Sequence, residues 1–117
     1  MSKAKLPKDT VGKPKMHLVP PSIMRGIAFV REYGNRKYGS PDNWKEVDPI
    51  DYVDAGMRHY LKILPDLFAI DEESGLPHLW QIACNVAFLC EKTYPELYQK
   101  YVDEQNRRAN SVDCPSK

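Results

Sequence analysis

The sequence lacks the features that mark several common classes of protein. No apolar run approaches the ~20 residues that a membrane helix needs. The N-terminal end carries lysines but no apolar segment of the kind found in secretion signals. No stretch alternates apolar and polar residues as a half-buried strand does, and no internal repeat is visible. These absences predict a helical protein of the cytoplasm with no membrane segment.

Cysteine is scarce, with three residues in the whole chain, an odd number. Cys84 and Cys90 lie six positions apart, about 9 Å along a helix axis and on different sides of it, which forbids a disulfide between them. We therefore expect a reducing, cytoplasmic compartment. The spacing of Cys84, Cys90 and Cys114 gives no support to a zinc site either.

Net charge is also small, at +1, so the chain has no overall field that favours nucleic acid or a membrane surface. The distribution is uneven, because residues 1–20 hold five lysines and one aspartate. Residues 1–16 are also broken by proline and glycine and are predicted to form a flexible basic arm. A solubilising tail is the favoured interpretation of this arm, and contact with nucleic acid is the alternative. The length predicts a single helical domain, placed at residues 17–108, with a disordered tail at 109–117.

Helix signals divide the chain after this arm. Ser22 is predicted to cap a first helix that ends at Gly34 or at Tyr38. Asp48, which is followed by a proline, is the strongest helix start in the sequence. Pro65 is predicted to end this second helix, because proline disrupts a helix interior.

Two further helices complete the prediction. The third runs from near Pro77 to about Lys92, and a weaker fourth opens at Thr93 and fades near Asn106. The apolar segment 16–21 is expected to dock on the body in extended form. The expected buried stripes of the second and third helices are Val53, Met57, Tyr60, Leu61 and Leu64, and Leu79, Ile82, Ala83, Val86 and Cys90. The fold class is all-α, a small helical bundle of about four helices with an extended basic N-terminal arm.

Acidic residues cluster in one short stretch between the second and third helices, Asp71-Glu72-Glu73-Ser74-Gly75-Leu76-Pro77-His78. Acids beside a helix N-terminus are common because they suit the positive end of the helix dipole, so a structural interpretation stands beside a functional one. Asn85 lies on the apolar third helix and must find hydrogen-bond partners there. A bond to a neighbouring helix and a role in ligand binding are both open for Asn85.

Polar groups that are not plainly on the surface gather on the predicted helices and on the segments between them. They are Lys37, Tyr38, Asn43, Trp44, Asp51, Asp54, Arg58, His59, Asp71, Glu72, Glu73, Ser74, His78, Gln81 and Asn85. Carboxylates with few soft ligands favour Mg²⁺ or Mn²⁺ over zinc. Lysine and arginine near such a metal are suited to bind phosphate. An aromatic ring such as Trp44 is suited to stack on a nucleotide base, and the alternative for Trp44 is that it covers the edge of the core. We therefore expect a metal-dependent nucleotide site inside the bundle.

Several spaced clusters carry a resemblance to one known family. They are Lys13-Pro14, Leu18-Val19-Pro20-Pro21, Tyr33-Gly34-Asn35-Arg36-Lys37-Tyr38-Gly39, Asn43-Trp44, Tyr52, Asp54-Ala55, Arg58-His59, the acidic segment 71–78 and Asn85. Over residues 13–90 their order is similar to that of the dATP/dGTP diphosphohydrolase N-terminal domain, a phage family related to the MazG-like nucleoside triphosphate pyrophosphohydrolases. The resemblance implies a helical homo-oligomeric hydrolase of phage nucleotide metabolism, in the host cytoplasm. Such an enzyme uses Mg²⁺ to cleave a (deoxy)nucleoside triphosphate to the monophosphate and pyrophosphate.

The chain departs from these relatives at a few positions. The Glu-x-x-Glu pattern of MazG helices is absent. Gln81 stands where members of the phage family often carry a second histidine, and Phe68-Ala69 stand where they often carry Gly-Glu. The metal ligands therefore do not transfer from MazG position by position.

The hypothesis drawn from these residues gives each polar group a task. Mg²⁺ (or Mn²⁺) is held by Asp54, Asp71 and Glu73, with Glu72 as an alternate ligand. The attacking water is oriented by His59 or His78. Cations bind the phosphates of the nucleotide, and aromatic rings and amides bind its base and sugar. The residues assigned to nucleotide binding are Lys37, Tyr38, Asn43, Trp44, Arg58 and Asn85. The alternative is a non-catalytic phage module that binds a nucleotide, or nucleic acid through the basic arm.

Overall fold

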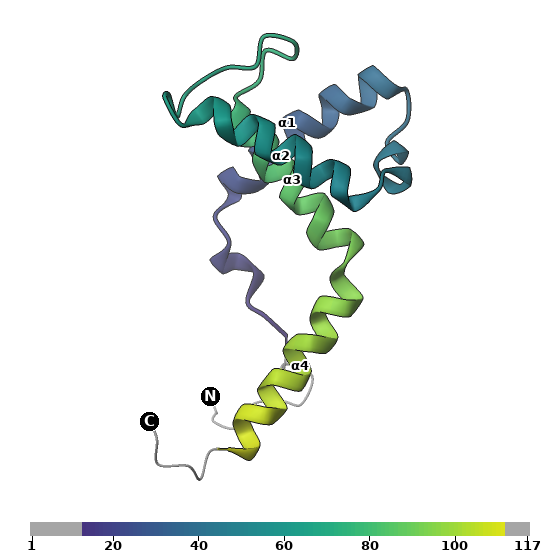
Figure 1. Ribbon diagram of the computed structural model, residues 1–117, viewed down its shortest axis with the longest axis vertical. Coiled ribbons are helices and arrows are strands. Elements are labelled where there is room, and N and C mark those ends of the chain that lie inside the picture. Colours follow the sequence, from purple (N-terminus) through teal and green to yellow (C-terminus); the bar gives the residue numbers. More distant parts are fainter. Residues whose placement is uncertain (1–12, 112–117) are drawn as a thin grey trace.

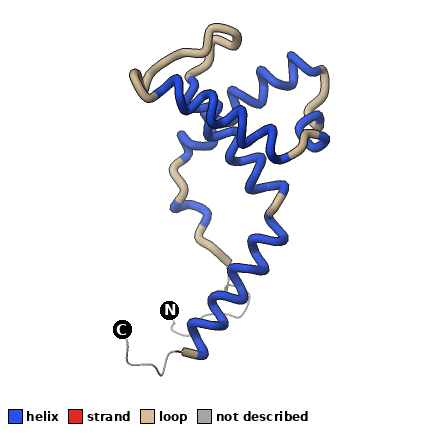
Figure 2. Tube along the Cα trace, in the orientation of Figure 1, coloured by secondary structure: helices blue, strands red, loops and turns tan. Residues whose placement is uncertain are grey.

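The computed structural model describes residues 13–111 and is built almost entirely of helices (Figure 1). The elements in chain order are η2 (Met16–Leu18), α1 (Pro21–Tyr38), η3 (Asn43–Glu46), α2 (Pro49–Ile63), α3 (His78–Lys92) and α4 (Tyr94–Asn110). Within the described residues no strand forms, as Figure 2 shows, and an isolated bridge joins Ile70 to Pro77. The predicted all-α class with four main helices is confirmed. The predicted arm lies outside the described residues up to position 12, as does the predicted tail from position 112.

The ends of α1 and α2 follow from local chemistry. Gly39 adopts φ 72° after α1, and its N–H donates to the carbonyl of Asn35 at 2.9 Å, which is a left-handed cap that glycine makes without strain. Asp48 caps α2 as predicted, because its Oδ1 accepts the N–H of Ile50 at 3.1 Å. The predicted cap at Ser22 is wrong, since α1 already begins at Pro21, whose fixed φ suits the first helical position.

The three helices α1, α2 and α3 form the body, with α3 packed against both of the others (Figure 1). α1 approaches α3 tightly at Gly26, where a β-carbon would lie 3.0 Å from the ring of Trp80. Phe29 stacks on the same ring with a centroid distance of 5.3 Å. This contact holds α1 over α3 and so sets the position of the second half of α1.

The fourth helix leads away from this body (Figure 1). Among the helices of residues 13–111, α4 packs closely against none, and it ends at Asn110 rather than near Asn106 as predicted. The radius of gyration of 19.0 Å is well above the roughly 13 Å of a compact chain of this length. None of the described helices is long and apolar enough to span a membrane.

The predicted core stripes of α2 and α3 are largely wrong. Leu61 is 64% exposed and Val86 50% exposed, and the exposed members of the two stripes are Val53, Met57, Tyr60, Leu61, Leu64, Leu79, Val86 and Cys90. The buried residues of α2 and α3 are instead Tyr52, His78 and Cys84. The two helices meet through a more polar pair of faces, so their most apolar faces point outward. The expected docking of segment 16–21 is wrong too, since every residue of that segment is exposed.

Candidate functional site

The acidic segment forms a tight loop just before α3. The N–H of Asp71 donates to the carbonyl of Leu76 at 2.9 Å, and the N–H of Gly75 donates back to the carbonyl of Asp71 at 2.7 Å. Gly75 adopts φ 75°, a backbone conformation that other residues rarely tolerate. This closed turn fixes where the carboxylates of Asp71 and Glu73 leave the backbone.

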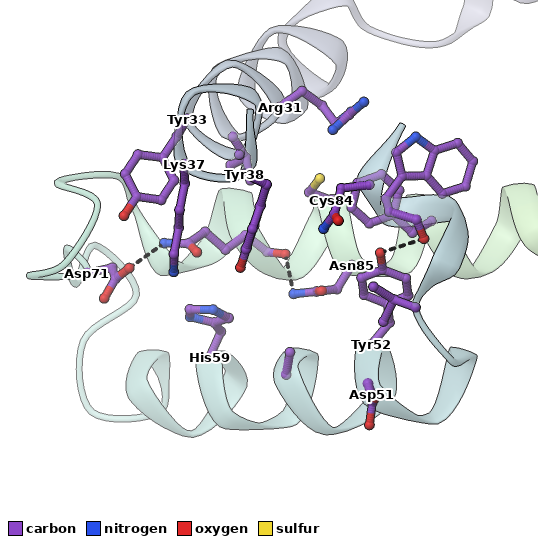
Figure 3. Close-up of a pocket in the computed structure, with 18 of the residues that line it drawn as sticks. Arg31, Tyr33, Lys37, Tyr38, Asp51, Tyr52, His59, Asp71, Cys84 and Asn85 are labelled. Carbon is purple, nitrogen blue, oxygen red and sulfur yellow. Dashed lines mark hydrogen bonds between the residues drawn. The ribbon is translucent and has the colours of Figure 1, made fainter. Parts of the chain in front are cut away.

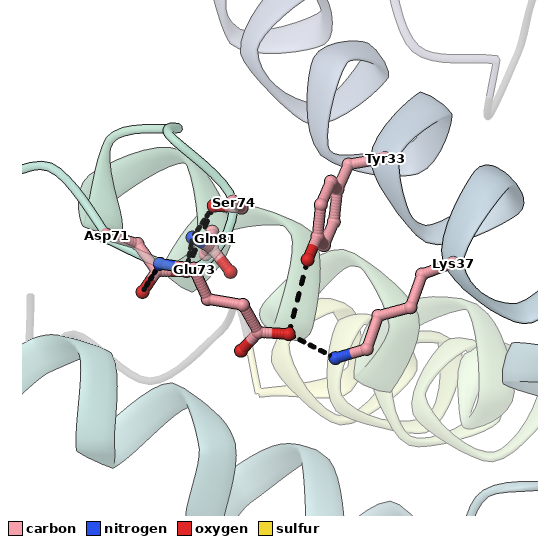
Figure 4. A network of polar contacts seen from close by, with 6 residues as sticks. All are labelled: Tyr33, Lys37, Asp71, Glu73, Ser74 and Gln81. Atoms are coloured by element: carbon pink, nitrogen blue, oxygen red, sulfur yellow. Dashed lines mark hydrogen bonds and ion pairs between the residues drawn. The ribbon is translucent and has the colours of Figure 1, made fainter.

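Asp71 faces back into its own loop and onto α3. Its Oδ2 accepts the hydroxyl of Ser74 and the amide Nε2 of Gln81, each at 2.9 Å (Figure 4). Burial raises the pKa of Asp71, but the hydrogen bonds from Gln81 and Ser74 outweigh burial and hold the pKa below its usual value. Asp71 therefore carries a negative charge and anchors the loop to α3.

Glu73 reaches in the other direction, to α1. Its Oε2 accepts from the Nζ of Lys37 at 2.5 Å and from the hydroxyl of Tyr33 at 3.2 Å (Figure 4). The hydrogen bond from Lys37 is the main reason that the pKa of Glu73 is lowered, and the same bond raises the pKa of Lys37. Two acids of one loop are thus tied to two different helices.

Two histidines face each other beside these acids. The Nδ1 atoms of His59 on α2 and His78 on α3 lie 2.7 Å apart, so one ring donates and the other accepts. His78 is buried, with 6% of its surface exposed, and His59 is half-buried. Burial, followed by the proximity of His78, lowers the pKa of His59. The lowered pKa favours a neutral His59. The hydrogen bond between the rings places a proton on one Nδ1, and in a neutral ring that proton leaves Nε2 of the same ring unprotonated.

A pocket of about 640 Å³ lies between α1, α2 and α3 (Figure 3). Its floor follows α3 from His78 through Gln81 and Asn85 to Phe88, which spans about 15 Å at 1.5 Å per residue. One end holds the charged groups and the histidine pair, namely Lys37, Arg58, His59, Lys62, Asp71, Glu73 and His78. The other end holds aromatic and amide groups, namely Asn43, Trp44, Tyr52 and Phe88, together with one acid, Asp51, and one cation, Arg31. The guanidinium of Arg31 lies 5.2 Å from the centroid of the Phe88 ring and donates to the carbonyl of Pro41. The pocket thus has a polar end and an aromatic end.

Two cations at the polar end make no ion pair to any of the residues 13–111. Arg58 and Lys62 lie one turn apart on α2, and both line the pocket. Neither side chain makes a hydrogen bond within the described part of the chain. A third cation, Lys37, is paired with Glu73. This end can therefore receive a ligand that carries several negative charges.

The aromatic end is built from stacked rings. Trp44 stacks on Phe88 with centroids 5.0 Å apart, and the hydroxyl of Tyr52 donates to the carbonyl of Trp44 at 2.9 Å. One face of the Trp44 ring is therefore covered by the core. Tyr38 is 58% exposed, so its ring offers more open surface to a planar ligand. The Nδ2 of Asn85 donates to the carbonyl of Gln81 at 2.8 Å, which directs the amide along α3.

The pocket gathers nearly all of the residues singled out in the sequence. Those that line it are Lys37, Tyr38, Asn43, Trp44, Asp51, Arg58, His59, Asp71, Glu73, His78, Gln81 and Asn85. Asp54 is exposed on α2 and does not line the pocket. Among residues 13–111 no three His, Cys, Asp or Glu side chains lie close enough together to hold a metal ion. Glu72 is exposed on the loop and does not line the pocket either.

Some lining residues were missed in the sequence. Lys62 follows Arg58 by four positions and Lys37 follows Tyr33 by four, a spacing that puts each pair on one helix face. That spacing was available as a signal for Lys62 and Tyr33. Phe88 and Arg31 gave no comparable signal, because their place depends on how α1 crosses α3.

Comparison with known proteins gives one result that bears on identity. The family model described as dATP/dGTP diphosphohydrolase, N-terminal, matches residues 3–104. No curated protein matches the chain. No solved structure matches it either. Since the family model covers most of the 117 residues, the chain belongs to the dATP/dGTP diphosphohydrolase N-terminal domain family.

Proposed function

We propose that the pocket binds a purine deoxynucleoside triphosphate and hydrolyses it to the nucleoside monophosphate and pyrophosphate. The description of the family names dATP and dGTP. The observation that carries the proposal is the division of one pocket into a cationic end with a histidine pair and an aromatic end with amide groups. A role in phage nucleotide metabolism follows from the sequence resemblance and belongs to the same proposal.

The substrate lies along α3 in this proposal. Arg58 and Lys62 bind the phosphates, because both cations line the polar end without an acidic partner among the described residues. Tyr38 provides the surface for the base at the rim, and Asn85 offers its amide oxygen to a donor on the base or the sugar. Trp44 and Asn43 bound the aromatic end.

The histidine pair supplies the base for the attacking water. The ring that donates through Nδ1 keeps a bare Nε2, which takes a proton from water as the water oxygen bonds to the α-phosphorus. The bond between the α-phosphorus and the bridging oxygen breaks, and pyrophosphate leaves with that oxygen. The partner histidine stabilises the new imidazolium, because its Nδ1 accepts the hydrogen bond between the rings.

Mg²⁺ (or Mn²⁺) enters the proposal together with the substrate. Asp71 and Glu73 line the polar end and would hold the ion there, since carboxylates are ligands that magnesium prefers. A cage of protein ligands alone does not fit the described residues, and Asp54 lies outside the pocket. When bound, the ion neutralises charge that develops on the phosphate oxygens.

Assay of the purified protein with dATP and dGTP, with Mg²⁺ or Mn²⁺, tests the proposal through release of pyrophosphate and monophosphate. His59→Gln is expected to lower turnover by about 10²-fold or more while nucleotide binding persists. His17→Gln is the matched control, because His17 is exposed on η2 and outside the pocket. Full turnover in His59→Gln would reject the catalytic role. Thermal stabilisation by a nucleotide with no product would instead indicate a binding module.

We also propose that the chain pairs with a second copy through the outward apolar face of α2 and α3. The apolar stripe of α2 consists of Val53, Met57 and Leu64, and that of α3 consists of Leu79 and Val86. On each helix the stripe lies one residue, or about 100°, further around the axis than the face that contacts the other helix. Because α2 and α3 run in opposite directions, this equal rotation brings both stripes to the same side of the pair, away from the pocket. A chain with so few buried apolar residues between positions 13 and 111 gains a core when two such faces meet.

Light scattering after size-exclusion chromatography tests the pairing. Met57→Glu places a charge in the middle of the apolar face and is expected to give a monomer or a soluble, partly unfolded chain. Arg36→Glu is the control, because Arg36 is exposed on α1, and it should leave the molecular mass of the particle in solution unchanged. A wild-type chain that elutes as a monomer at all concentrations would reject the pairing.

A further inference from the structure

We infer that Lys37 and Tyr33 form a subsite for a phosphate oxygen, and that Glu73 occupies it as an exchangeable internal competitor. The inference rests on the proposed function for the identity of the ligand, an anionic phosphate group. It adds an order of events, because Glu73 has to leave α1 before a phosphate takes its place. It also separates the roles of the two acids in the loop.

The geometry at Glu73 is that of an anion site. Tyr33 and Lys37 lie one turn apart on α1, and both point at the same carboxylate oxygen, Oε2 (Figure 4). An ammonium and a hydroxyl that both donate to one negatively charged oxygen can donate equally well to an oxygen of a phosphate group. Both donors line the pocket at the end where Arg58 and Lys62 lie. The subsite is therefore part of the cationic end.

Glu73 can leave this subsite at low cost. The side chains of the ion pair are 41% and 61% exposed for Lys37 and Glu73, and ion pairs this exposed to water contribute little to stability. The loop does not depend on the pair, since it is closed by the bonds between Asp71 and Gly75 and tied to α3 through Gln81. The side chain of Glu73 can therefore swing away while the loop keeps its shape.

Asp71 cannot make the same exchange. Its carboxylate accepts from Ser74 and Gln81, two neutral donors whose loss would open the loop. It holds no cation that a phosphate could take over within the described residues. The exchange is thus a property of Glu73 alone among the acids that line the polar end.

The exchange couples a divalent cation to the phosphate. A phosphate that binds Lys37 and Tyr33 releases Glu73, and a released carboxylate at the polar end is available to a cation that accompanies the phosphate. A cation that binds Glu73 in turn frees Lys37 and Tyr33 for the phosphate. Since coupling between two ligands is reciprocal, each is expected to raise the affinity for the other.

Isothermal titration of the purified chain with inorganic pyrophosphate, in the presence of a metal chelator, tests the competition. Glu73→Gln is expected to bind pyrophosphate more tightly than wild type by up to about fivefold, the ratio that corresponds to loss of an exposed ion pair. Combining it with Lys37→Gln should abolish this gain. Glu32→Gln is the matched control, because Glu32 is exposed on α1 next to Tyr33 and does not line the pocket. Its affinity should equal that of wild type.

The same titration with Mg²⁺ present tests the coupling. Mg²⁺ should raise the affinity of the wild type for pyrophosphate by a larger factor than that of Glu73→Gln. The inference would be overturned if Glu73→Gln, with a melting curve that matches wild type, bound pyrophosphate without metal no more tightly than wild type does. It would also be overturned if no variant bound pyrophosphate. Hydrolysis of dATP is measured in parallel, so a chain that hydrolyses without the gain in affinity refutes the exchange alone. A chain that shows the gain without hydrolysis refutes the catalytic proposal alone.

Discussion

Replacing Gly26 by alanine tests how α1 is held over the pocket. Gly26 is the only buried residue of α1 within the described chain, and a β-carbon there would meet the Trp80 ring at 3.0 Å. Gly34 lies two turns further along the same helix, and a β-carbon there would meet nothing within 4 Å. The two positions therefore share a helical backbone and differ in the space around them.

The magnitudes follow from this difference. Alanine is favoured over glycine in a helix by about 1 kcal/mol, so Gly34→Ala should stabilise the chain by roughly that amount. Gly26→Ala has the same gain, but forcing a methyl group against a packed ring costs about 1–3 kcal/mol. The two variants should therefore differ in unfolding free energy by about 1–3 kcal/mol, with Gly26→Ala the less stable.

Thermal melting by circular dichroism at one fixed protein concentration measures the difference. A gap of 1 kcal/mol corresponds to about 4–8 °C in Tm for a domain near this size. Since α1 carries Lys37 and Tyr33 to the pocket, Gly26→Ala should also weaken nucleotide binding. Equal shifts of Tm for Gly26→Ala and Gly34→Ala would refute the reasoning, because they would show that Trp80 does not limit the space at Gly26.

Three further changes test other parts of the pocket. Tyr52→Phe removes the hydrogen bond to the carbonyl of η3 and should lower the unfolding free energy by about 1 kcal/mol, measured by urea denaturation. Arg58→Gln and Lys62→Gln should each raise the Kd for dATP about tenfold by titration calorimetry, whereas Arg36→Gln should not. The lowered pKa of His59 means that the unfolded chain takes up a proton first as the pH falls below about 6.5. Stability should therefore be full above that pH and decline below it, and His59→Gln should flatten the decline in urea midpoints.

Local features of the fold were predictable because they depend on a few neighbouring residues. Asp48 caps α2 through a bond two residues along the chain, and Gly39 ends α1 through a backbone angle of its own. The acidic turn is closed by Gly75 and by bonds within five residues. Each of these needs only the right residue type at the right position.

The relation between helix faces was less predictable. Leu61 and Val86 belong to the most apolar stripes of α2 and α3, yet both are exposed, and Tyr52, His78 and Cys84 are buried in their place. Periodicity shows that a helix has an apolar face but does not say what covers that face. A surface left for a second chain and a surface inside the same chain give the same pattern.

The sequence by itself determined the helical class, the helix limits to within a few residues and the family, and nearly all of the site residues that it predicted line the pocket. Only the tertiary structure decided their partners. In the tertiary structure His59 contacts His78, Glu73 pairs with Lys37 from 36 positions away in the sequence, and Asp54 lies outside the pocket. The physical reason is range, since caps and turns are bonds between near neighbours, whereas these partnerships depend on how α1 and α2 pack on α3.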